Sequence, residues 1–166
     1  MTVAEGHRRE LLEGLRRFVV SVRRVPGVRR ISVLGSIVTA KRDPKDVDVL
    51  VEVADNADLA PLAAASRRLQ GHAQGLNRGA DVFLADERGM YIGRTCHWRD
   101  CRPGVRQLCD ALHCGRRPYL HDDLEAIRLD SGLVRLPPVT LWPCLERRDP
   151  LPADVEELLA ALEHAV

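Results

Sequence analysis

The most regular pattern in the sequence is an alternation over residues 46–53, with a valine at every second position and polar residues at all but one of the others, which predicts a β-strand. One face of this strand carries the valines Val47, Val49, Val51 and Val53. The other face carries Asp46, Asp48, Leu50 and Glu52. Aspartate is depleted in strands, so two aspartates on a valine-rich strand need a reason. They either form the solvated face of an edge strand or are paired oxygen ligands for a hard cation such as Mg²⁺.

The segment before this strand favours the ligand interpretation. Residues 28–34 end in an apolar run and predict another strand, after which Gly35 and Ser36 predict a tight turn and a short helical turn. Glycine allows the backbone to approach a ligand closely, and Ser36 can offer a backbone N–H and a hydroxyl to a phosphate. Lys41 and Arg42 lie in the loop that follows and could meet further phosphate charge.

Helical periodicity appears on both sides of this segment. Apolar residues recur at helical spacing over residues 4–24, 57–75 and 153–166. Residues 79–85 are a short apolar run with Asp81 near its start and predict a third strand. The order of these elements predicts an α/β (α+β) fold, a mixed sheet with helices packed against one face.

The Gly35-Ser36 turn, the Asp46-x-Asp48 strand and the later Asp81 resemble the nucleotidyltransferase superfamily, which has the polymerase-beta-like fold. The resemblance covers residues 28–85. In size the chain looks closest to the small stand-alone minimal nucleotidyltransferases of bacterial toxin–antitoxin pairs. It therefore implies a nucleotidyltransferase-like mixed sheet with flanking helices.

The resemblance also implies a reaction, the Mg²⁺-dependent transfer of a nucleoside monophosphate from an NTP to a hydroxyl of a protein, an RNA or a small molecule. Asp46 and Asp48 would bind Mg²⁺, with Asp48 bridging both ions if two bind. Asp81 would complete the second site and help to deprotonate the acceptor hydroxyl. The Gly35 backbone and Ser36 would hold the β- and γ-phosphates, and Lys41 and Arg42 would be further triphosphate contacts. The alternative is a non-catalytic nucleotidyltransferase-like scaffold that binds a partner.

The second half of the chain has a different character, and we expect a nucleotidyltransferase-like core over residues 1–90 and a Cys/His-rich extension over residues 91–166. Thiols cluster at Cys96, Cys101, Cys109 and Cys114, with His97 and His113 as alternative ligands. They are either packing residues or a structural Zn²⁺ site that stabilises a docking surface. We expect helices over residues 103–114 and 121–129, and extended segments over 133–136 and 139–142 around two prolines.

Composition changes this picture little. The chain has 166 residues, 45% apolar and 30% charged, with a net charge of +1, so no strong overall field draws it to nucleic acid. Its arginines come in adjacent pairs such as Arg8-Arg9, most of which we expect on solvated helix faces. No apolar run is long enough for a transmembrane helix, and the charged N-terminus lacks a signal-peptide core. We therefore expect a cytoplasmic protein with no membrane partner, in which disulfides are disfavoured.

Overall fold

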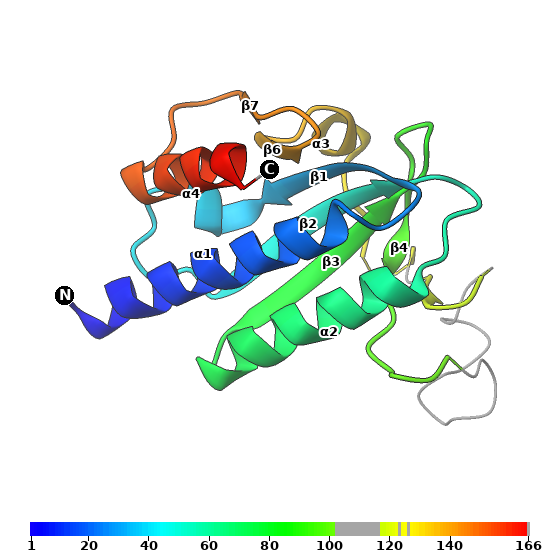
Figure 1. The fold of residues 1–166 in the computed structure, drawn as a ribbon, viewed down its shortest axis with the longest axis horizontal. Coiled ribbons are helices and arrows are strands. Elements are labelled where there is room, and N and C mark those ends of the chain that lie inside the picture. The colour runs from blue at the N-terminus through cyan, green and yellow to red at the C-terminus, as the bar shows by residue number, and fades with distance from the viewer. Residues whose placement is uncertain (102–116, 123, 126, 166) are drawn as a thin grey trace.

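The computed structural model describes residues 1–101, 117–122, 124–125 and 127–165 (Figure 1). The helices are α1 (Val3–Val22), the 3₁₀ helix η1 (Gly35–Val38), α2 (Ala60–Gly75), α3 (Ser131–Arg135) and α4 (Ala153–His164). The strands are β1 (Val28–Leu34), β2 (Asp46–Val53), β3 (Gly79–Ala85), β4 (Tyr91–Thr95), β5 (Leu120–His121), β6 (Val139–Trp142) and β7 (Glu146–Arg147).

The strands form one mixed sheet in the order β5-β4-β3-β2-β1-β6-β7. β2 and β3 run parallel, joined by α2, whereas the other neighbouring strands that the structure describes run antiparallel. β2 is therefore an interior strand, with β1 on one side and β3 on the other. The interpretation of its aspartates as the solvated face of an edge strand is wrong, because both of its edges are hydrogen-bonded.

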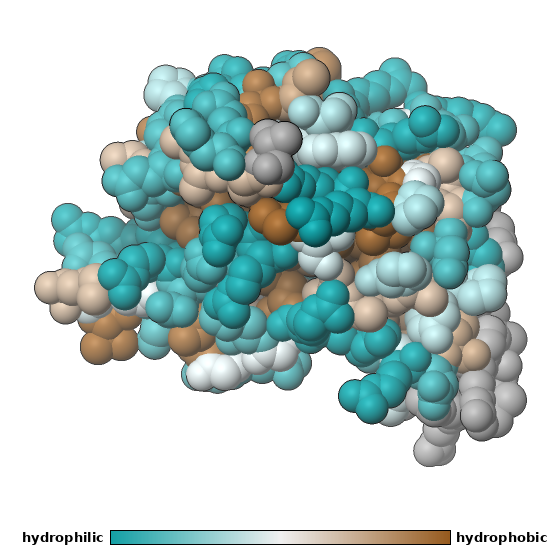
Figure 2. Space-filling model, in the orientation of Figure 1, coloured by the Kyte–Doolittle hydropathy of each residue, from teal (hydrophilic) through white to brown (hydrophobic). Residues whose placement is uncertain are grey.

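The three long helices cover one face of the sheet, and Figure 1 shows α1 between α2 and α4 in front of the strands. The inward-facing valines of β2 pack there against the apolar stripes of these helices and form the main core. Hydrophilic side chains cover most of the outer surface of this helical layer (Figure 2). The mixed sheet is confirmed, and its three long helices lie against one face as expected, whereas the short helix α3 does not. The relation of this sheet to the nucleotidyltransferase fold stays a prediction.

A smaller apolar cluster lies on the opposite face of the sheet. It consists of Leu34, Leu50, Phe83, Ala85 and Val134, the last from the short helix α3. Leu34 lies directly opposite Asp48, and Leu50 and Phe83 come two residues after the aspartates of β2 and β3. The cluster therefore borders the acids, and α3 covers only part of this face. The remaining part holds the polar residues of β2 and β3.

Local signals explain where the helices begin. α1 starts at a capping box, in which the Thr2 hydroxyl accepts the backbone N–H of Glu5 and the Glu5 carboxylate accepts the backbone N–H of Thr2. α2 starts three residues later than expected, and the Asp58 carboxylate accepts the backbone N–H of Ala60 at 2.9 Å.

The second half of the chain extends the same sheet at both edges, with β4 and β5 beyond β3 and β6 and β7 beyond β1. The helix expected over residues 121–129 is wrong for the residues described there, because β5 ends at His121 and helix α3 begins at Ser131. Asp130 caps α3 by accepting the backbone N–H groups of Gly132 and Leu133. Residues 133–135, expected to be extended, thus belong to α3, whereas the extended segment at 139–142 is confirmed as β6. The helix expected over residues 103–114 lies outside the described residues.

None of the helices that the structure describes is both long enough and apolar enough to cross a membrane.

Candidate functional site

The three predicted acids share one face of the sheet, the face opposite the long helices. Asp48 on β2 and Asp81 on β3 are direct partners in the parallel register, so their Cα atoms lie side by side. Asp46 lies two residues before Asp48 on the same face, opposite Gly79. The structure thus brings together residues that are separated by more than thirty positions in the sequence.

Two glycines make room for two of these carboxylates. Gly35 has a φ of +74°, and a Cβ atom at its position would lie 2.5 Å from Oδ2 of Asp48. A Cβ atom on Gly79 would collide in the same way with Oδ1 of Asp46. The sequence predicted Gly35 as a point of close approach to a phosphate, which stays a prediction. The structure shows a close approach of Gly35 to Asp48. Gly79 was not predicted, and its only sequence signal was its place at the start of a strand.

The acids differ in their electrostatic environment. Burial, followed by the nearby charges of Asp81 and Asp46, raises the pKa of Asp48 from 3.8 to about 6. Asp46 and Asp48 have no hydrogen-bond or ion-pair partner among the residues that the structure describes. Asp81, by contrast, accepts a hydrogen bond from Nη1 of Arg94 on β4 at 3.0 Å. Negative charge is therefore least compensated around Asp46 and Asp48.

A divalent cation fits the chemistry of this donor set. Carboxylate oxygens are the ligands that Mg²⁺ prefers, and a cation would stabilise the Asp48 carboxylate against the burial and the repulsion that raise its pKa. In the part of the chain that the structure describes, no group of three His, Cys, Asp or Glu side chains is arranged to bind one metal ion. Asp46 and Asp48 are the residues that would hold a cation with the least rearrangement, since Arg94 contacts Asp81.

The Gly-Ser turn leads into η1, four residues of 3₁₀ helix rather than an α-helix. The Thr39 hydroxyl and backbone N–H both bond to the carbonyl oxygen of Ser36, at 2.7 and 3.1 Å, which closes the turn. The Ser36 side chain is half-buried, and Lys41 and Arg42 are exposed in the loop that follows. The loop thus begins beside Asp48 and presents two cations to solvent.

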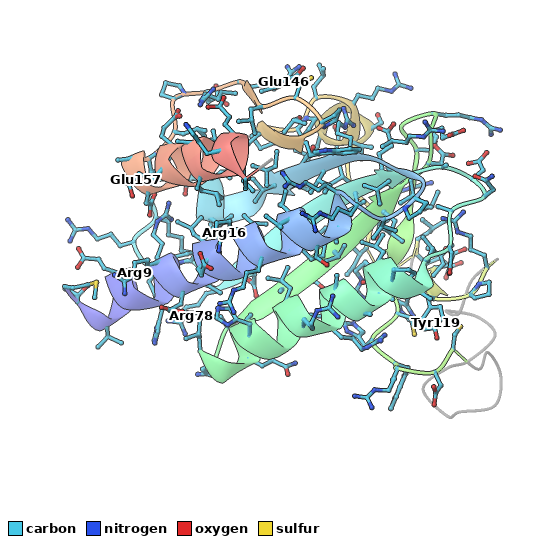
Figure 3. All side chains as sticks on the ribbon, in the orientation of Figure 1. Arg9, Arg16, Arg78, Tyr119, Glu146 and Glu157 are labelled. Atoms are coloured by element: carbon cyan, nitrogen blue, oxygen red, sulfur yellow. The ribbon has the colours of Figure 1, made fainter. Side chains whose placement is uncertain are left out.

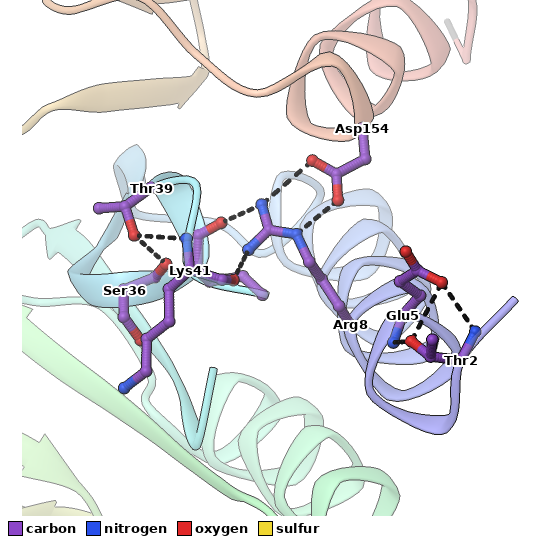
Figure 4. Close-up of polar contacts among 8 residues, drawn as sticks. Thr2, Glu5, Arg8, Ser36, Thr39, Lys41 and Asp154 are labelled. Atoms are coloured by element: carbon purple, nitrogen blue, oxygen red, sulfur yellow. Dashed lines mark hydrogen bonds and ion pairs between the residues drawn. The ribbon is translucent and has the colours of Figure 1, made fainter. Parts of the chain in front are cut away.

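Arg8 of α1 holds this loop in place, and sequence reasoning missed it. Its guanidinium donates to the carbonyl oxygens of Ile37 and Lys41, both at 2.9 Å, and pairs with the Asp154 carboxylate of α4 at 2.5 and 3.0 Å (Figure 4). Arg8 is only 7% exposed, although its place in an arginine pair predicted a solvated side chain. Its spacing from Leu11, Leu12 and Leu15 on the buried stripe of α1 was the available signal.

A second arginine fixes the other end of the loop. Figure 3 shows Arg78 between α1 and α2. Its Nη2 atom lies 2.6 Å from Oδ1 of Asp43 and 3.2 Å from Nδ1 of His7. Asp43 also pairs with Lys45 at 3.0 Å. The connection between the Gly-Ser turn and β2 is therefore held at one end by the buried Arg8 and at the other by the partly buried Arg78.

Two of the four predicted zinc ligands lie in the described part of the chain. Cys96 is buried at the end of β4, and the Cys101 sulfur accepts the backbone N–H of Tyr119 at 3.1 Å. Cys109 and Cys114 lie outside the described residues, as does the alternative ligand His113. The zinc site therefore stays a prediction.

The comparison with protein families gives one match, to a family of unknown function, DUF6932, over residues 1–102. The chain belongs to this family. The DUF6932 match contains the three acids, Arg94 and the loop that Arg8 holds, but it ends before β5. No curated protein and no solved structure matches the chain.

Proposed function

We propose that the protein is an Mg²⁺-dependent nucleotidyltransferase, which moves a nucleoside monophosphate from an NTP to a hydroxyl group. The observation that carries this proposal is the register of β2 and β3, which sets Asp48 beside Asp81 with Asp46 on the same face. The Gly35 turn at this point supports it further, because Gly35 packs directly against the Asp48 carboxylate. A phosphate-binding turn and a set of carboxylates are then neighbours, as phosphoryl transfer requires.

Each part of the site has a role that its chemistry allows. Asp46 and Asp48 would hold Mg²⁺, which when bound would neutralise the charge that develops on the transferred phosphoryl group. The backbone of Gly35 and the hydroxyl of Ser36 would bind the terminal phosphates, and Lys41 and Arg42 would approach the same oxygens from the loop. Asp81 would accept the proton of the attacking hydroxyl, directly or through water.

The pKa of Asp48 sets a pH dependence for this function. Metal ligands must be deprotonated, and the Asp48 carboxyl takes up a proton as the pH falls through about 6. Cation affinity and transfer should therefore fall below that pH, although free aspartate remains ionised there.

The acceptor is a hydroxyl of a protein, an RNA or a small molecule, and a toxin–antitoxin partner would belong to the first two groups. The test is incubation of the full chain with Mg²⁺ and each α-labelled NTP in turn, together with a cell extract. We expect label on a protein, an RNA or a small molecule, and its loss in Asp48→Asn. Gly71→Ala, an exposed change in α2 with open space around it, is the matched control and should keep transfer.

The same experiment separates the enzyme from a non-catalytic scaffold. A scaffold would bind NTP or a partner without moving the label, whatever the nucleotide. No transfer with any of the four NTPs, from protein that binds Mn²⁺ and is folded, would contradict the proposal.

A further inference from the structure

We propose that Arg94 occupies the place of a second metal ion, so that the site takes one divalent cation, held by Asp46 and Asp48. This inference rests on the proposed function and specifies how many ions that site holds. The observation behind it is the ion pair between Nη1 of Arg94 and Oδ1 of Asp81, at 3.0 Å. The side chains of Arg94 and Asp81 are 19% and 34% exposed, so both are largely withdrawn from solvent.

The backbone places Arg94 beside Asp81 by register. Arg94 pairs with Phe83 across the antiparallel β3–β4 ladder, and Phe83 is two residues after Asp81 on the same strand. Paired residues share a face of the sheet, so Arg94 lies on the face that carries the acids. β4 is itself paired on its other edge with β5, where Arg94 lies opposite His121, and this fixes the strand from both sides.

The charges of the site are consistent with one ion. A guanidinium stays protonated at every physiological pH, so Arg94 is a permanent positive charge on Asp81. A second divalent ion at Asp81 would lie next to the guanidinium and be repelled by it. Among the described residues, Asp46 and Asp48 have no ion-pair partner, and that is where the one cation belongs.

The test counts bound Mn²⁺, a spectroscopic substitute for Mg²⁺ at carboxylate sites. The protein without nucleotide is dialysed against Mn²⁺ at about pH 7.5, well above the ordinary pKa of aspartate. The bound ions are then counted and examined by electron paramagnetic resonance. We expect one ion in the wild type and in Arg94→Lys. In Arg94→Met we expect a second bound ion. Its dissociation constant should be lower, by about tenfold or more, than that of any second ion in the wild type. The spectrum should show coupling between two ions about 3.5–4 Å apart in Arg94→Met only.

Arg30→Met is the matched control. Arg30 is another arginine of this sheet face, 3.2 Å from the carboxylate of Glu52 and of similar exposure, but it lies apart from the three acids. It should bind one ion, as the wild type does. If Arg30→Met also gained a second ion, loss of any nearby positive charge would explain the result and the inference would be overturned.

Two further outcomes would overturn it. One is a coupled pair of ions in the wild type, which decides the question even if Arg94→Met does not fold. The other is a single ion in folded Arg94→Met. Failure of the proposed function is a different result, since it would appear as no label transfer whatever the number of ions. Absence of Mn²⁺ from every variant would remove the metal site, and with it both proposals.

Discussion

The Oδ2 atom of Asp48 lies 2.5 Å from the point where a Cβ atom on Gly35 would stand. The Gly35-Ser36 turn and the acidic strand are thus one structural unit, in which the shape of the turn decides where the Asp48 carboxylate can lie. The positive φ of Gly35 adds a second requirement for glycine at this position.

Gly35→Ala should therefore lower both stability and cation binding. The left-handed backbone and the displaced carboxylate should together reduce the free energy of unfolding by about 1–3 kcal/mol. The Mn²⁺ affinity should fall by about tenfold or more. Urea denaturation and Mn²⁺ titration measure the two effects. Gly71→Ala, with no atom within 4 Å of the added Cβ, should instead stabilise the protein by about 0.5–1 kcal/mol. Equal effects of the two substitutions would contradict this explanation.

Asp48→Asn should stabilise the metal-free protein at neutral pH. The folded state raises the pKa of this carboxyl from 3.8 to about 6, so ionisation of Asp48 opposes folding. That penalty is complete above about pH 6 and vanishes below about pH 4, where folded and unfolded states are both protonated. We expect a gain of about 1–2 kcal/mol at neutral pH, reduced from the full shift because the side chain is partly solvated.

Thermal unfolding across pH 4–8 (a range of about two units on either side of the raised pKa) checks the sign of this effect. Mn²⁺ should reverse the order at neutral pH, because only the wild type keeps both ligands. Glu157→Gln, a change at an exposed acid of α4 (Figure 3), should show neither behaviour. A gain that persisted at low pH would show that packing, not charge, was responsible.

Arg8→Met should loosen the loop between η1 and β2. The substitution removes the donors for the carbonyl oxygens of Ile37 and Lys41 and leaves Asp154 without its partner. We expect a loss of about 2–3 kcal/mol in the free energy of unfolding, and a higher KM for NTP because Lys41 is no longer held. Arg9→Met, at the exposed neighbour seen on α1 in Figure 3, should change stability by less than about 0.5 kcal/mol. Similar losses from both would mean that helix propensity dominates.

The zinc prediction can be tested directly by metal analysis of protein purified without chelator. We expect about one equivalent of zinc, bound through Cys96, Cys101, Cys109 and Cys114, with an affinity that falls in acid as the thiolates are protonated. Less than about a tenth of an equivalent, with all four thiols titratable in the folded protein, would leave them as ordinary packing residues.

The three strands of the site were predicted with their observed bounds, because each combines a regular apolar pattern with a clear break at both ends. The common face of Asp46 and Asp48 also followed from the period of a strand. Their position beside Asp81 did not, because the sequence carries no direct signal for the parallel register of β2 and β3. Arg94 was missed for the same reason, since it reaches Asp81 from a strand whose pairing the sequence does not specify.

The weakest predictions fell on short elements in the second half. The residues described within the range 121–129 are not helical, and Asp130 instead caps the short helix α3 that follows this range. A five-residue helix has little periodicity of its own and depends on burying Val134 against the sheet. Such tertiary contacts override local preference, which is why the long helices were predicted well and this one was not.

The ion pair between Arg8 and Asp154 spans 146 positions of the chain. At the usual rate of synthesis, about 5–20 residues per second, the ribosome adds Asp154 roughly 7–30 s after Arg8. During that interval α1 and the strands of the site can be complete while the guanidinium lacks its carboxylate. All three acids of the site are therefore synthesised before the ion pair between Arg8 and Asp154 can form. In nascent chains stalled between β4 and α4, we expect the loop that carries Lys41 to be more sensitive to protease than in the complete fold.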